Sequence, residues 1–187
     1  MIKLITYNWL KARESNYNQI PCIKRLMYGY FDTGPVKRIP IEKLINKLIQ
    51  SEHTKQANRI ITKILGSEDN IRYTIFCAEQ TANFVGDKEI IKLSIKAIKS
   101  VKEYLENQSK ETKKDLKNKA YAVKFLPARA AIIAASSPIS CTGAIAEGAY
   151  HIAVNTLKYY NKDEYRNTVK NLKNKIVKYG IKLIMEE

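Results

Sequence analysis

The sequence has few of the residues that build disulfides, metal centres and most catalytic sites. It contains 3 cysteines among 187 residues, all far apart, and 2 histidines, His53 and His151. An odd number of scattered cysteines without a CxxC pair argues against a disulfide framework or a structural zinc site, and suits a reducing compartment. We therefore expect a cytoplasmic protein that holds no metal and no cofactor.

Targeting segments, membrane spans and catalytic motifs are also missing. The N-terminus, MIKLITYNWLKARE, lacks the apolar core and small-residue cleavage site of a signal peptide. The most apolar uncharged run, residues 130–146, contains Pro138 and several hydroxyl residues, so it is too short and too polar for a membrane span. No Walker motif, GxGxxG, EF-hand loop, HExxH or GxSxG occurs. We expect neither a membrane protein nor an enzyme.

Apolar residues recur at helical spacing from residue 40 onward, and no segment alternates with the period of two that strands require. The pattern predicts an amphipathic helix over 41–49 and a second over 57–65 that stops at Gly66, together a helical hairpin. Ser67 opens a third helix, which ends at Gly86. Asp87 caps a fourth, with an expected apolar face of Ile91, Ile95, Ile98, Val101 and Leu105.

The second half of the chain surrounds a stretch of small side chains, residues 128–158. The polar segment before it, 107–119, is predicted to be either a solvated loop or the first turns of a helix that continues through Phe125. Ser137-Pro138 divides the stretch into an incoming helix and an outgoing helix over 139–160. Asn161 or Asp163 caps the last helix, whose apolar seam can pack within the bundle or against a partner: Tyr165, Val169, Leu172, Ile176, Tyr179 and Leu183.

These patterns predict an all-α fold, a single-domain helical bundle of about seven to nine helices around an alanine-rich central helix pair. The domain spans residues 1–187. Residues 40–187 form its helical core, and 1–39 form an N-terminal extension of less determined structure.

Four polar residues are candidates for buried positions. Glu147 and His151 are four residues apart, so they share a helix face. They could form a catalytic or metal-binding pair, but we interpret them as a hydrogen-bonded polar pair at a helix contact. Glu79 lies two turns after Arg72, and a buried carboxylate there needs a cationic partner, so we expect a structural salt bridge.

Basic residues outnumber acidic residues by 33 to 18, which gives a formal net charge of +15. Such a surface attracts polyanions: nucleic acid, an acidic membrane face or an acidic protein. The 12 tyrosines could add base stacking. The candidate partner-facing residues are Lys88, Lys92, Lys96, Lys99, Lys110, Lys113, Lys114 and Lys117.

Three segments carry a family resemblance: NIRYTIFCAEQTANFV with the following EIIKLSIKAIKSVKEYL, the alanine-rich residues 120–150 running into AIAEGAYHIAVNTLKYY, and NKIVKYGIKLIMEE. Together they make residues 40–187 resemble the immunity proteins assigned to bacterial polymorphic-toxin systems, which also occur in phage and mobile elements. The chain differs from that pattern at Gly86-Asp87-Lys88, where members often carry an Arg-Pro-Arg turn, and in its alanine-rich segment, which holds fewer histidines. The resemblance implies an all-helical, non-enzymatic, cytoplasmic binding protein and assigns no functional residues.

Three functional hypotheses follow. The first is an immunity-like protein that neutralises a toxin or other protein partner with an acidic face, because opposite charges speed association. The alternative is a basic, nucleic-acid-associated accessory protein of a phage or mobile element. The third is an enzyme centred on Glu147 and His151. The sequence indicates neither the partner's identity, nor the binding surface, nor the oligomeric state.

Overall fold

The computed structural model describes residues 4–6, 9, 38–82, 84–85, 87–120, 122–137, 141–160 and 165–186. Eight helices account for most of these residues, and the all-α prediction is confirmed. The helices are α3 (Ile41–Gln50), α4 (Thr54–Ile64), α5 (Ser67–Ala82), α6 (Lys88–Glu106), α7 (Lys110–Ala120), α8 (Leu126–Ser136), α9 (Thr142–Tyr160) and α10 (Tyr165–Glu186). The strands β1 (Leu4–Ile5) and β2 (Ile39–Pro40) pair antiparallel.

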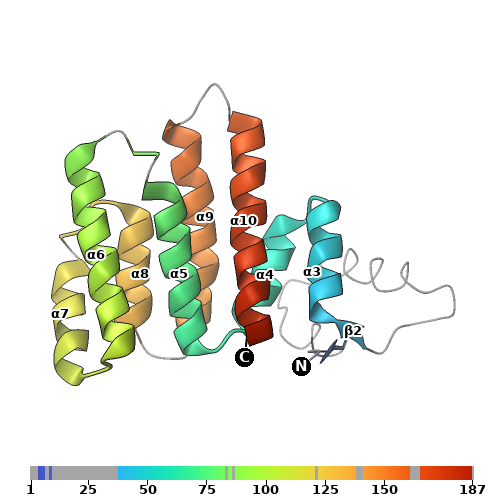
Figure 1. Cartoon of the computed structure of the whole chain (residues 1–187), viewed down its shortest axis with the longest axis horizontal. Coiled ribbons are helices and arrows are strands. Elements are labelled where there is room, and N and C mark those ends of the chain that lie inside the picture. Colours follow the sequence, from blue (N-terminus) through green and yellow to red (C-terminus); the bar gives the residue numbers. More distant parts are fainter. Residues whose placement is uncertain are drawn as a thin grey trace, which may run out of the picture.

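The helices form a bundle that is longer than it is deep (Figure 1). The pair α6 and α7 lies at one end and α3 at the other, with α5, α8, α9 and α10 between them. Helices α5, α8 and α9 pack closely against one another. Alanine is the commonest buried residue of α8 and α9, and its small side chain lets neighbouring backbones approach.

Helix α5 separates two hydrophobic cores. Its Tyr73 and Cys77 belong to a core shared with α3, α4, α9 and α10. Its Ile71, Ile75 and Ala78 belong to a second core shared with α6, α7 and α8. A helix that is buried on opposite sides shows little apolar asymmetry, which is why the periodicity of this segment is weak.

Gly180 marks the closest approach of α10 to the rest of the bundle. A Cβ atom at this position would lie 2.5 Å from Cγ2 of Ile61 on α4 and 2.9 Å from Cε2 of Tyr73 on α5. Both neighbours are fully buried. The glycine in the C-terminal segment therefore allows α10 to pack against α4 and α5 at once.

Several predicted boundaries are confirmed. The side chain of Asp87 caps α6 by accepting hydrogen bonds from the backbone N–H groups of Glu89 and Ile90, at 2.8 and 3.2 Å. The alanine-rich stretch is divided as expected, since α8 ends at Ser136 and α9 begins at Thr142. The seam of α10 packs within the bundle through Val169, Leu172, Ile176 and Leu183, whereas the side chain of Tyr165 is outside the described residues.

Three predictions about the fold are wrong. The third helix, expected to end at Gly86, ends at Ala82, and Phe84 and Val85 lie outside it. Ile95 was expected on the buried face of α6, but it is 58% exposed. The face that packs against the second core instead uses Ser94, Ala97 and Tyr104 together with Ile98 and Val101. The helix expected to continue through Phe125 is two helices, because Phe125 is extended and Pro127 occupies the first turn of α8.

Other expectations fall on residues outside the described set. They concern Pro138, the caps Asn161 and Asp163, and most of the N-terminal extension 1–39.

Candidate functional site

The polar residues predicted to be buried do not converge on one site. Glu147 of α9 is largely buried, and its Oε1 accepts a hydrogen bond from Nε of Arg59 on α4 at 3.0 Å. The sequence reasoning missed Arg59, which lies 88 residues away and has no local signal that points to Glu147. Glu147 is therefore half of an interhelix ion pair.

His151 is half-buried and lies next to a group of cations. Its ring contacts that of Tyr150 edge to face, with centroids 5.1 Å apart. Burial lowers the pKa of His151, and the charge of Lys55 lowers it further; Glu147 raises this pKa, and Arg59 and Lys173 lower it. Among the described residues no hydrogen bond joins His151 to Glu147. The expected hydrogen-bonded helix contact is formed by Glu147 alone, and its partner is Arg59.

A polar network surrounds this ion pair. The Tyr73 hydroxyl donates to Oδ1 of Asn58 at 2.7 Å, and the Tyr150 hydroxyl donates to Oγ1 of Thr54 at 3.1 Å. Burial raises the pKa of the Cys77 thiol above its ordinary range, so this group stays protonated. Within the part of the chain that the structure describes, no group of three histidine, cysteine or acidic side chains could hold a metal ion.

Arg72 and Glu79 are placed differently from the prediction. Arg72 is exposed, contrary to expectation, and it pairs with two acids in the first turn of α5: Glu68, and Asp69 at 3.0 Å. Glu79 is about one-third exposed, so it is not buried, and it forms an ion pair with Nζ of Lys102 on α6 at 2.7 Å. The predicted salt bridge therefore exists, but its cation is a lysine from the neighbouring helix.

The lysines predicted to face a partner on α6 lie together on one exposed face. We call this the α6 face, formed by Lys88, Lys92, Lys96 and Lys99 with the exposed side chains of Leu93 and Ile95. Lys99 is paired with Glu103 at 3.7 Å. Beside Ile95, a shallow groove of about 560 Å³ runs between α5 and α6, lined by apolar and charged side chains.

The predicted lysines of α7 form a second basic surface, separate in sequence from the first. Lys110, Lys114 and Lys117 are exposed, and α7 buries only Leu116 and Ala120. Lys113 does not fit the prediction, since it is partly buried and its Nζ donates to the carbonyl oxygen of Ser137 at 3.4 Å. This contact places a cation at the C-terminal end of α8, which the helix dipole favours.

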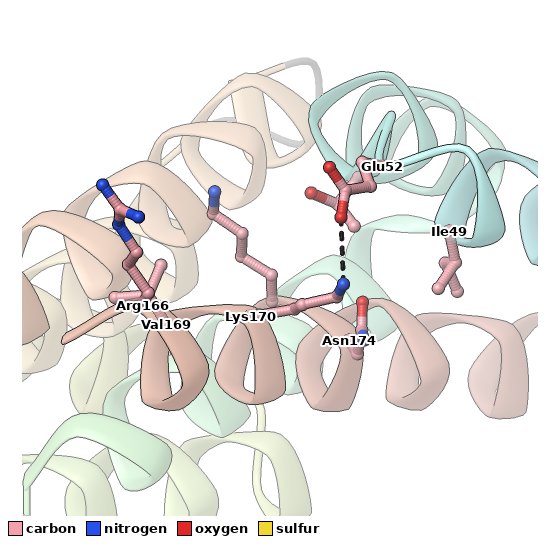
Figure 2. Close-up of a pocket in the computed structure, with 8 residues that line it drawn as sticks. Ile49, Glu52, Arg166, Val169, Lys170 and Asn174 are labelled. Carbon is pink, nitrogen blue, oxygen red and sulfur yellow. Dashed lines mark hydrogen bonds and ion pairs between the residues drawn. The ribbon is translucent and has the colours of Figure 1, made fainter. Parts of the chain in front are cut away.

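A third basic feature was not predicted. The α3–α4 connection and the first half of α10 enclose a cleft of about 270 Å³ (Figure 2). In it, Glu52 accepts a hydrogen bond from Nζ of Lys170 at 2.9 Å, and Arg166 rises from the same helix. These residues are 118 positions apart in sequence, so only the fold brings them together.

Comparison with known proteins does not assign the chain to a family. The sequence matches no protein-family model, and neither the curated proteins nor the solved structures contain a detectably similar chain. The resemblance to immunity proteins therefore stays a prediction. None of the described helices combines the length and apolar character that crossing a bilayer requires.

Proposed function

We propose that this chain is a non-enzymatic, cytoplasmic binding protein that neutralises an acidic protein partner in the manner of an immunity protein. The observation that carries the proposal is the α6 face. There Leu93 and Ile95, 47% and 58% exposed, flank a stripe of lysines at one end of the bundle. Exposed apolar side chains next to charged ones are found at protein interfaces.

The combination of apolar and basic side chains on the α6 face favours a protein as the binding partner over a nucleic acid. Phosphate contacts are made by cations and hydrogen-bond donors, whereas burial of Leu93 and Ile95 needs an apolar surface on the partner. Removal of apolar area from water contributes about 25 cal/mol per Å². The four lysines add charge complementarity, which speeds association and excludes basic competitors.

The neutralising role rests on the motif resemblance over residues 40–187, and co-expression tests it. The gene adjacent to this one is expressed from an inducible promoter, with and without this protein. We expect induction alone to arrest growth and co-expression to restore it. Normal growth of cells that express the neighbouring gene alone would overturn the neutralising role.

A nucleic-acid-associated function is the second candidate, and it is favoured by α7. This helix exposes Lys110, Lys114 and Lys117 and buries few residues. It predicts binding to DNA or RNA that weakens steeply with salt, because each phosphate contact releases a counterion. A gel shift at low salt that disappears in a Lys110→Gln/Lys114→Gln/Lys117→Gln variant would support it, and no shift at low salt would remove it.

A further inference from the structure

The cleft between the α3–α4 connection and α10 concentrates positive charge. Arg166, Lys170 and Lys173 are spaced four and three residues apart on α10, which places them on one side of the helix. Among the described residues that line this cleft, Glu52 is the only acid, and it is paired with Lys170 at 2.9 Å. The lining therefore carries an excess of two positive charges.

The cations of this cleft repel one another. Like charges three and four residues apart destabilise a helix, by about 0.2–0.5 kcal/mol per pair in isolated helices. Lys173 is partly buried, so its charge is screened less than that of a fully exposed lysine. Lys173 also acts on Glu52, whose pKa is lowered first by the hydrogen bond from Lys170 and then by the charges of Lys170 and Lys173.

The uncharged lining adds hydrogen-bond donors. The Thr54 hydroxyl oxygen accepts from Tyr150 at 3.1 Å, so its own proton is available to a ligand. The Asn174 side-chain amide lines the same wall. The planar fork of Arg166 matches the oxygens of a phosphate, which it can contact in pairs.

We propose that this cleft binds a phosphate group, carried either by a small molecule or by a nucleic acid. One phosphate supplies up to two negative charges and three acceptor oxygens, which matches the excess charge and the donors. A carboxylate supplies one charge and two oxygens, and so does a single phosphodiester of a nucleic-acid backbone, so a nucleic acid matches the lining only by placing two neighbouring phosphates in the cleft. The volume of about 270 Å³ is near the lower limit for ligand sites, so it suits one or two phosphate groups.

The site is independent of the proposed function, because it lies on α10 and the α3–α4 connection and shares no residue with the α6 face. Loss of phosphate binding and loss of partner binding are therefore separable.

Calorimetric titration of the full-length protein with inorganic pyrophosphate at about 0.15 M salt tests the proposal. We expect saturable binding at one site, weakened about tenfold or more in an Arg166→Gln/Lys173→Gln variant, since each substitution removes a cation next to the ligand. A Lys114→Gln/Lys117→Gln variant on α7 loses the same charge and should bind as the wild type does. Circular dichroism verifies that both variants are folded.

The absence of saturable binding would overturn the proposal, and so would an equal loss in both variants, which indicates diffuse attraction to a basic protein. Competition then identifies the source of the phosphate. If a nucleoside diphosphate displaces pyrophosphate and a single-stranded oligonucleotide without terminal phosphates does not, the site binds small molecules. Displacement by the oligonucleotide assigns the site to a nucleic-acid backbone.

Discussion

Nε of Arg59 on α4 lies 3.0 Å from Oε1 of Glu147 on α9, and both side chains are about four-fifths removed from solvent. Removal of either partner leaves a charge with reduced access to water. We expect Arg59→Gln or Glu147→Gln to lower the free energy of unfolding by about 1–3 kcal/mol. Urea denaturation measures this, with exposed Lys92→Gln as a control that should change little.

A double-mutant cycle isolates the pair. If the ion pair stabilises the contact between α4 and α9, the Arg59→Gln/Glu147→Gln protein should be more stable than the sum of the single effects predicts. Strict additivity would contradict a direct interaction.

Alanine substitutions at Gly180 and Gly148 should have opposite effects on stability. Gly180→Ala places a Cβ against Ile61 and Tyr73 and should destabilise the protein by about 1–3 kcal/mol through overpacking. Gly148→Ala, in the interior of α9, meets no atom within 4 Å and should stabilise it by about 0.5–1 kcal/mol through helix propensity. Thermal unfolding distinguishes the two, and equal shifts in the same direction would refute the close approach of α10.

The burial of His151 predicts that the free energy of unfolding decreases in mild acid. Folding lowers the pKa of His151, mainly through burial. The imidazole therefore binds a proton more tightly in the unfolded chain than in the folded protein. This contribution to the free energy of unfolding is fully present above the ordinary histidine pKa of about 6.5, and it is lost as the pH falls from there through the pKa of His151 in the folded protein.

Urea denaturation at about pH 7.5 and about pH 5.5 should show this decrease, and a folded His151→Gln protein should show a smaller one. A decrease of the same size in both proteins would assign the pH dependence to other groups.

The sequence predicted what depends on local patterns and missed what depends on how helices meet. Residues 41–49 show a complete apolar stripe, and Asp87 is followed by a helix with an acid in its first turn, so both elements were predictable. The burial of Ile95 was mispredicted because a helix of this composition offers two adjacent apolar faces, and only contact with α5 and α8 selects one. The same applies to the basic cleft and to the Arg59–Glu147 pair, whose members are far apart in the chain.

The most direct test of the central claim is the affinity of the purified protein for the product of its neighbouring gene, measured by calorimetry for the wild type and two variants. Ile95→Asp/Lys96→Glu alters the α6 face by two exposed substitutions, and Lys114→Glu/Lys117→Glu alters α7. The account predicts tight binding by the wild type and the α7 variant, and a loss of about a hundredfold in the α6 variant. Unchanged binding by the α6 variant, or no binding by the wild type, would contradict it.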